Sequence, residues 1–239
     1  MSGKRPWSSR ASVTFCIDPV VVPKTYEVRH CGVLPSGEAL LSCPLWKEAE
    51  LLTDFCFPWN SEVLPPRTEF KGLWDGERFG FHFDVTDHDI VIGEGDSPGS
   101  RALESDRVEL FWARDGHLDP YWGFEMNPNG DVLAYEGRYH RQMNWDWQCP
   151  DWQVVAELRP DGYRVAGSVL IEVLREWGVW RETSQGGGET MTGVYRGEFS
   201  RGPGLTVRRD WISWVHPDTE IPDFHVPASF GRFVFHPAG

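Results

Sequence analysis

The sequence predicts an all-β protein, an antiparallel β-sandwich of jelly-roll type with at most one or two short helices. Long helical periodicity is almost absent from the 239 residues, whereas short alternating runs of apolar and polar residues recur throughout. The 25 Gly and 18 Pro residues are spread between these runs and form no linker. We therefore expect one domain over residues 1–239, with a core sandwich at 60–239 and an irregular wrap of edge strand and loops at 1–60.

The clearest strand is predicted at residues 78–85 (RFGFHFDV), because four large apolar side chains alternate there with smaller or polar ones. The Asp75-Gly76 pair before it predicts a tight hairpin with residues 69–74. Further strands are predicted at 106–112, 121–127, 132–135, 154–158, 163–170, 194–199, 211–215 and 230–235, with a short helix around 171–177 and a loop at 185–189.

Charge and hydropathy exclude several classes of partner. The chain has 36 acidic and 23 basic residues, a net charge of −13, so it repels phosphate backbones and anionic lipid headgroups. We therefore expect neither nucleic acid nor a membrane as partner, and no run approaches the roughly 18 apolar residues of a membrane span. The first residues lack the apolar segment of a secretory signal, which favours a cytoplasmic location unless a leader was removed.

The five cysteines predict reduced thiols. They are odd in number and widely spaced, with no CxxC pair and no Cys and His residues at zinc-ligand spacing. A disulfide within the N-terminal group is expected only if the protein is exported to an oxidising compartment. The five are Cys16, Cys31, Cys43, Cys56 and Cys149.

Tryptophan is the most unusual feature of the composition, and it points to a carbohydrate ligand. The chain has 13 Trp residues and 14% aromatic residues, more than a core alone usually requires. Aromatic rings beside many carboxylates suit flat, uncharged ligands that stack on ring faces and form hydrogen bonds at their edges. In the polar segment HRQMNWDWQCPDW, Trp145 and Trp147 are candidates for such stacking; the alternative is that these rings and Trp152 cover one end of the core.

Two glutamates are predicted to face each other on one side of the sheet. If residues 106–112 and 121–127 form a hairpin centred on His117, Glu109 lies directly opposite Glu125. Directly opposed carboxylates repel each other, so such a pair persists only where a cation, a shared proton or ligand hydroxyl groups offset the repulsion.

Both structural and functional explanations of this pair remain open. Arg107 together with Arg138 or Arg196 would neutralise the two glutamates as a purely structural network. A sugar-binding site would use them to hold hydroxyl groups. Glycoside hydrolysis, in which two carboxyl groups act as acid and as nucleophile or base, is the catalytic alternative.

Several segments carry a resemblance to a known family: 70–85 (FKGLWDGERFGFHFDV), 106–112 (DRVELFW), 124–135 (FEMNPNGDVLAY), 162–169, 211–217 (WISWVHP) and 230–235. Together and in this order they resemble the family 9 carbohydrate-binding modules, most closely the stand-alone bacterial proteins of that type. The resemblance covers most of residues 60–239. It implies a jelly-roll β-sandwich that binds xylan- or cellulose-derived sugars in carbohydrate catabolism, often beside a xylanase, with bound calcium in characterised members.

The resemblance also assigns sugar contacts to particular residues. The sugar-contacting glutamate of the family falls on Glu109, whereas its contacting arginine falls on Glu125, which is a departure. A contacting glutamine falls near Arg196. The two tryptophans that clamp the sugar fall on Leu103 and Phe224, so the clamp is reduced to one aromatic ring. These departures leave open a different ligand or a vestigial site.

We therefore expect a non-catalytic sugar-binding sandwich whose ligand is a neutral saccharide or oligosaccharide. The alternatives are a glycoside hydrolase, or an accessory domain of one, that uses the two glutamates, and a scaffold without a small ligand. The residues expected to contact the sugar are Glu109, Glu125, Arg196, Phe224, Trp145 and Trp147.

Calcium is the one cofactor that the resemblance implies. In FDVTDHDI, the side chains of Asp84, Asp87 and Asp89 offer oxygen ligands of the kind that calcium prefers. The segment lacks the glycine-containing loop of an EF-hand, so the residues themselves predict a solvated turn.

Overall fold

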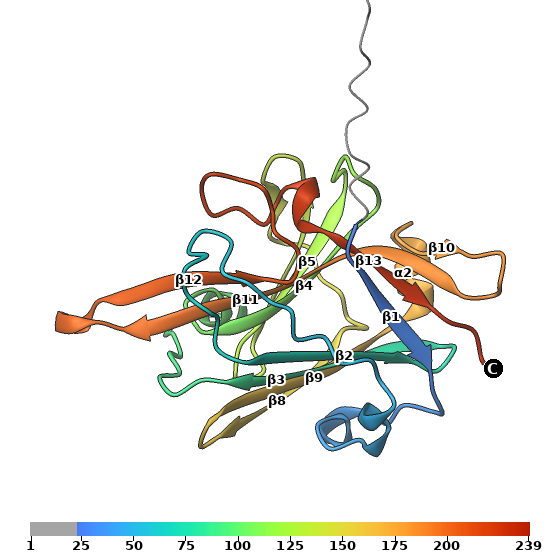
Figure 1. The fold of residues 1–239 in the computed structure, drawn as a ribbon, viewed down its shortest axis with the longest axis horizontal. Coiled ribbons are helices and arrows are strands. Elements are labelled where there is room, and N and C mark those ends of the chain that lie inside the picture. The colour runs from blue at the N-terminus through green and yellow to red at the C-terminus, as the bar shows by residue number, and fades with distance from the viewer. Residues whose placement is uncertain (1–22) are drawn as a thin grey trace, which may run out of the picture.

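The computed structural model describes residues 23–239, and its all-β architecture confirms the predicted fold class. Two layers of strands face each other, with short helices and loops at their ends (Figure 1). The predictions that concern residues 1–22, including Cys16, the missing secretory signal and the start of the N-terminal wrap, lie outside the described residues.

The strands of the described chain are β1 (Thr25–His30), β2 (Thr68–Trp74), β3 (Arg78–Thr86), β4 (Arg107–Ala113), β5 (Tyr121–Met126), β6 (Val132–Arg138), β7 (Gln142–Asn144), β8 (Gln153–Arg159), β9 (Gly162–Leu170), β10 (Arg181–Glu182), β11 (Gly188–Arg201), β12 (Val207–Ser213) and β13 (Gly231–Phe235). The helices are α1 (Pro98–Leu103) and α2 (Ile171–Glu176), with 3₁₀ turns η1 (Gly37–Leu40), η2 (Pro44–Lys47), η3 (Pro203–Leu205) and η4 (Pro227–Ser229).

The strands follow one hydrogen-bonded order, β7-β6-β5-β4-β11-β13-β1-β2-β3-β9-β8, with β10 and β12 added to β11. This sheet curls so that its two halves form the two layers of the sandwich. Most pairs are antiparallel, but β1 runs parallel to both neighbours. Residues Thr25 to Val28 pair with β13, and Arg29 and His30 pair with β2, so β1 joins the two halves.

The edge position predicted for the strand within residues 1–60 is wrong, because β1 lies between two other strands. Its inward-facing residues Tyr26 and Val28 are fully buried, at 1% and 0% exposure. The prolines that suggested an edge lie outside the strand: Pro23 precedes it and Pro35 follows it. Because β1 itself contains no proline, each of its residues keeps a backbone N–H group that can form a hydrogen bond to a neighbouring strand.

The predicted hairpins are confirmed. β2 and β3 pair across the Asp75-Gly76 turn, where Gly76 adopts a φ of +94° that suits glycine. β8 and β9, which include the strands predicted at 154–158 and 163–170, also pair as an antiparallel hairpin. In the hairpin of β4 and β5, Glu109 lies directly opposite Glu125, as the sequence predicts.

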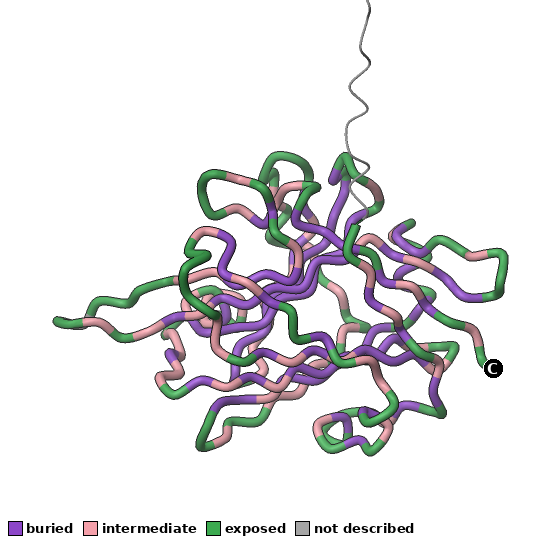
Figure 2. Tube along the Cα trace, viewed as in Figure 1, coloured by how far each residue is buried: buried purple, intermediate pink, exposed green. Residues whose placement is uncertain are grey.

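The core between the two layers consists largely of aromatic rings. Phe79, Phe81 and Phe83 project inward from β3, as their alternation predicts, and meet Trp112 and Phe124 from the other layer. Buried segments run through the middle of both layers (Figure 2). Much of the unusual aromatic content is therefore used in packing, which narrows the set of rings that can reach a ligand.

Helix α2 lies where the sequence predicts a helix, whereas α1 was missed. α1 has six residues, too few for a helical periodicity to be recognised. Local capping determines it instead: Ser97 and Ser100 form a reciprocal capping box, and Pro98 occupies the first turn.

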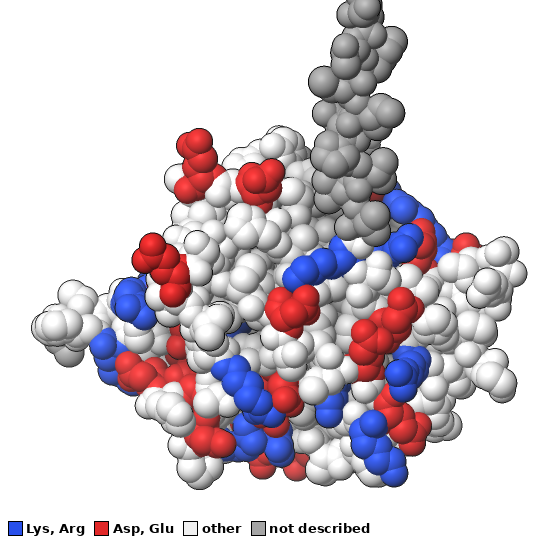
Figure 3. Space-filling model, viewed as in Figure 1, with Lys and Arg blue, Asp and Glu red and all other residues white. Residues whose placement is uncertain are grey.

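Charged side chains of both signs are interspersed on the surface (Figure 3). Many form ion pairs; Asp84, for example, lies 2.6 Å from Arg159 and 2.9 Å from Arg164. Within residues 23–239, no helix is both long enough and apolar enough to cross a membrane. The cysteines of this part of the chain are free thiols, as predicted: Cys31, Cys43, Cys56 and Cys149.

Candidate functional site

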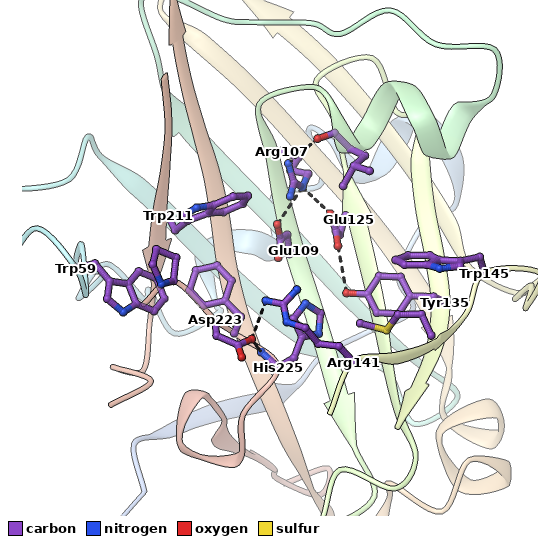
Figure 4. A pocket seen from close by; sticks show the side chains of 14 residues that line it. Trp59, Arg107, Glu109, Glu125, Tyr135, Arg141, Trp145, Trp211, Asp223 and His225 are labelled. Atoms are coloured by element: carbon purple, nitrogen blue, oxygen red, sulfur yellow. Dashed lines mark hydrogen bonds and ion pairs between the residues drawn. The ribbon is translucent and has the colours of Figure 1, made fainter. Parts of the chain in front are cut away.

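A cavity of about 550 Å³ lies on the outer face of β4, β5 and β6, away from the core (Figure 4). Strand alternation explains its position: Val108 and Leu110 face the core, so Arg107 and Glu109 face outward. These strands supply the floor. The walls come from Trp59, from Trp211 on β12 and from the segments 141–145 and 222–225.

The floor holds two carboxyl groups around one guanidinium group. Nε of Arg107 lies 3.0 Å from Oε1 of Glu109 and 2.6 Å from Oε2 of Glu125. The three residues are 3%, 2% and 6% exposed, respectively. Arg107 therefore offsets the repulsion between the two glutamates, as one of the sequence-based explanations proposed, whereas Arg138 pairs with Asp119 instead.

Burial and the excess of negative charge in the floor favour the protonated form of Glu109. Burial, followed by the neighbouring Glu125 carboxylate, raises the pKa of Glu109 to about 8, although Arg107 acts in the opposite direction. Burial lowers the pKa of Arg107, but the two carboxylates outweigh it and hold that pKa above its usual value. At neutral pH the carboxyl group of Glu109 thus keeps its proton and can donate a hydrogen bond.

Arg107 is held in place by the backbone and by aromatic rings. Its Nη1 donates hydrogen bonds to the carbonyl oxygens of Leu103, at 3.1 Å, and Ser105, at 3.4 Å. The guanidinium carbon lies 5.2 Å from the ring centroid of Trp211 and 5.5 Å from that of Phe199. The charged floor is therefore organised before any ligand arrives.

Tyr135 on β6 connects the floor to one wall. Its hydroxyl donates a hydrogen bond of 3.1 Å to Oε1 of Glu125, and burial and the Glu125 charge raise its pKa, so the proton stays on the phenol. The ring lies against Gly123 of β5, where a Cβ atom would come within 2.3 Å of it. The ring of Trp145 also packs edge-on against it, with ring centroids 5.2 Å apart.

A second hydrogen-bonded group surrounds Asp223. Its carboxylate accepts hydrogen bonds from His140 at 2.7 Å and Arg141 at 2.8 Å. Burial opposes ionisation, but these bonds and one from the His225 backbone N–H hold the pKa of Asp223 below its usual value. Burial, together with the charge of Arg141, lowers the pKa of His225 to about 3. His225 is therefore neutral, and its Nδ1 lies 2.8 Å from the hydroxyl of Tyr121.

Aromatic rings form the walls. Trp145 is 56% exposed, and Trp59 and Trp211 are partly exposed. Phe224 lies between the latter two, at centroid distances of 5.5 Å and 6.1 Å, but it is only 6% exposed. One face of Phe224 is stacked on Tyr195 at 4.3 Å. The tryptophan rings therefore present more surface to a ligand than Phe224 does.

The structure brings four of the six predicted contact residues to this cavity: Glu109, Glu125, Phe224 and Trp145. Trp147 is not among its lining residues. Its ring is partly buried against the core, 5.8 Å from Phe124 and 5.5 Å from Trp177. Trp147 thus corresponds to the alternative prediction, in which such rings cover the end of the core.

Arg196 is also absent from the cavity, because it faces the other side of the sheet. On β11 it pairs with Val108, so the two side chains share the inner face, and Arg196 is 0% exposed. It contacts the carboxylate of Glu198 and lies 3.5 Å from that of Asp87. The next residue, Gly197, pairs with Arg107 and so lies on the cavity side of the sheet, whereas the side chain of Arg196 does not.

An acidic cluster is formed by Asp87, Asp106 and Glu198. One carboxylate oxygen from each residue lies within 4.8 Å of the other two, which is close enough to hold a metal ion. Arg196 already supplies positive charge there, so the cluster does not fit a calcium ion beside it. The other acidic residues of the predicted turn form ion pairs elsewhere, Asp84 with Arg164 and Asp89 with Arg201.

Several residues of the cavity were not predicted from the sequence, among them Trp59, Arg141, Trp211, Asp223 and His225. Trp211 had a recognisable signal, because it alternates with the buried Ile212 and must therefore face away from the core. The other four lie on loops, where no periodic pattern specifies which way a side chain points.

These features define a β-sandwich with a preformed cavity that combines charged and aromatic groups. The fold is similar to that of a candidate carbohydrate-binding protein from Bacteroides uniformis, with a TM-score of 0.69 and 20% identity over 90% of this chain and 100% of that one. It is also similar to a family 9 carbohydrate-binding module from Caldicellulosiruptor kristjanssonii solved with glucose and with cellotriose. Both complexes give a TM-score of 0.53 and 17% identity over 90% of this chain, covering 97% and 95% of the module.

The chain thus has the β-sandwich fold of the family 9 modules, which confirms the fold implied by the resemblance in sequence. No protein-family model and no curated protein sequence matches this chain.

Proposed function

We propose that this chain binds a neutral saccharide in the cavity over β4, β5 and β6 and does not act on it chemically. The observation that carries the proposal is the combination of a hydrogen-bonding, charged floor with aromatic walls in one cavity of about 550 Å³. Sugar rings have apolar faces and hydroxyl edges, which complement these two kinds of surface. The modules of similar fold that were solved with glucose and cellotriose support the same class of ligand.

The balance of charge in the cavity favours an uncharged sugar. Arg107 and Arg141 face the carboxylates of Glu125 and Asp223, and Glu109 holds a proton at neutral pH because of its raised pKa. The formal charges of the lining therefore cancel. A sugar acid or sugar phosphate would bring a charge without a free counterion. Xylose- and glucose-based saccharides, of the kind that xylan and cellulose release in carbohydrate catabolism, are the proposed ligands.

Isothermal titration with xylose, glucose, galactose and their short oligosaccharides tests the proposal. Glu109→Ala removes a hydrogen-bonding group from the floor, and we expect roughly ten- to hundredfold weaker binding. Glu136→Ala is the matched control, because Glu136 lies next to Tyr135 on β6 and outside the cavity. Absence of heat with every sugar, or equal affinities of Glu109→Ala and the control, would contradict the proposal.

A glycoside hydrolase is the second candidate, and one observation favours it. Glu109 and Glu125 are directly opposed, and the raised pKa of Glu109 suits a general acid at neutral pH. The same geometry argues against hydrolysis. Both carboxyl groups contact one nitrogen of Arg107, so the guanidinium occupies the space between them where the reacting sugar carbon would have to lie.

An assay for new reducing ends separates the two functions. Wild-type protein and Glu109→Gln are incubated with xylo- and cello-oligosaccharides, and products are measured at neutral pH. We expect no release above the blank from either protein. Release by the wild type that Glu109→Gln abolishes would instead establish the hydrolase.

A further inference from the structure

A second cavity, of about 540 Å³, adjoins the first. It lies between α1, the start of β6 and the segment 145–152. Two residues line both cavities, Leu103 at the end of α1 and Trp145. The two spaces are therefore separated by a shared rim and not by a layer of the fold.

The shared rim is an exposed aromatic ring. Trp145 is 56% exposed, the highest value among the tryptophans of residues 23–239, and Leu103 beside it is 42% exposed. The edge-on contact with Tyr135 fixes the Trp145 ring, and the hydroxyl of Tyr135 is bonded to Glu125 in the first cavity. An oligosaccharide that extends from the floor of the first cavity into the second must therefore pass over the ring of Trp145.

The two cavities differ in chemistry. No residue that lines the second cavity carries a formal charge. Leu133, Ala134 and Trp152 supply apolar surface, and the exposed Gln148 supplies an amide that both donates and accepts hydrogen bonds. Such a surface suits the apolar face and one hydroxyl edge of an uncharged sugar ring.

The second cavity is also preformed. Arg101 of α1 forms two hydrogen bonds with Asp131, at 3.0 Å and 2.5 Å, which fix the helix to the turn before β6. On the other side, Trp152 is stacked on Phe124 with ring centroids 3.9 Å apart. No folding of loops is required before a ligand binds, so little ordering entropy opposes binding there.

We propose that the second cavity is a further subsite for the same ligand, which is therefore an uncharged oligosaccharide that crosses Trp145. The inference rests on the proposed sugar-binding function. The charged cavity holds one end of the oligosaccharide through its hydroxyl groups. The uncharged cavity holds the following unit or units through apolar contact and the Gln148 amide.

Titration with mono-, di- and trisaccharides of the xylose and glucose series tests the subsite. We expect the wild type to bind di- or trisaccharide at least roughly three- to tenfold more tightly than the monosaccharide, the gain of one further hydrogen-bonded contact. Gln148→Ala removes the amide, and Ala134→Leu fills the cavity. Both variants should lose this gain and bind the monosaccharide within about twofold of the wild type. Gln185→Ala, an exposed loop residue outside both cavities, is the matched control.

The outcomes separate this inference from the function on which it rests. If monosaccharides bind but longer sugars bind no more tightly, or if both variants keep the full gain, the second subsite is wrong and the sugar-binding function stands. If no sugar binds the wild type, both proposals fail.

Discussion

Two groups of buried charges lie on opposite sides of the same strand pair, β4 and β11. On the outer side, Arg107 holds Glu109 and Glu125 at the floor of the cavity. On the inner side, Arg196 holds Asp87 and Glu198 between the two layers. Each group combines one arginine with two buried or partly buried carboxyl groups, but only the outer group lines the cavity described above.

The difference shows what separates a structural charge network from a binding site. Arg196 is 0% exposed, and the groups that it contacts belong to the fold, among them the hydroxyl of Thr68, to which it donates a hydrogen bond of 3.1 Å. The outer group leaves its carboxyl groups facing a space lined by Trp145 and Trp211. The inner group is enclosed by the protein, whereas the outer group can form hydrogen bonds with the hydroxyl groups of a ligand.

The largest expected effect is on the inner group. Arg196→Met leaves Asp87 and Glu198 buried without a counterion, and we expect the free energy of unfolding to fall by roughly 3–5 kcal/mol. Denaturant unfolding measures the loss. Arg196→Lys keeps the charge and should lose less. If Arg196→Met is as stable as the wild type, the inner group is not a structural ion pair.

Arg107→Met tests the outer group, and a smaller loss of stability is expected. Its carboxyl groups border a cavity that water can enter, whereas those of the inner group lie between the two layers, so we expect a loss of roughly 1–3 kcal/mol. Saccharide affinity should fall at least about tenfold, because the floor loses its organising cation. Comparison of the two methionine variants by unfolding and titration checks both expectations. A larger stability loss for Arg107→Met than for Arg196→Met would reverse the comparison.

The same charges predict a pH dependence of stability. The pKa of Glu109 is raised from 4.5 to about 8, as is that of Glu198, and burial is the main cause in both. Between these values the folded state binds more protons than the unfolded state, so the free energy of unfolding falls as pH rises. The stabilisation is fully present below pH 4.5 and is lost as pH rises through about 8.

Denaturant unfolding at intervals from about pH 5 to about pH 9 measures this dependence. Glu109→Gln cannot ionise, so its stability should fall less over the interval than that of the wild type. Glu136→Gln, outside the cavity, should follow the wild-type curve. A Glu109→Gln curve that parallels the wild type would mean that Glu109 titrates normally.

The comparison also shows how far the sequence determines the site. The period of two in β4 and β5, with the short turn between them, was sufficient to pair Glu109 with Glu125. Arg196 was assigned to the site by the resemblance and not by alternation, and its register opposite Val108 turns its side chain to the inner face of the sheet. The sandwich was therefore predictable from alternation, whereas register across a long connection was not.

Two further features required tertiary information. The prolines on either side of β1 favour an edge strand in the sequence. Its interior position follows only from its pairing with both β13 and β2. Trp59, Asp223 and His225 lie on loops, and contacts distant in the sequence, such as the bond between Asp223 and His140, bring them to the cavity.

The smallest effect on stability is expected for the exposed ring at the rim of the cavity. Trp145 is 56% exposed, so Trp145→Ala should lower the free energy of unfolding by less than about 1 kcal/mol. Its loss of stacking should still weaken saccharide binding roughly three- to tenfold, since such aromatic contacts contribute about 0.5–1.5 kcal/mol. Leu158→Ala is the matched control, because Leu158 is 50% exposed on β8 and lies outside both cavities. Equal saccharide affinities of the two variants would mean that Trp145 does not contact the sugar. A loss of affinity in Trp145→Ala without a loss of stability would show that a charge network in this fold becomes a binding site where exposed rings border it.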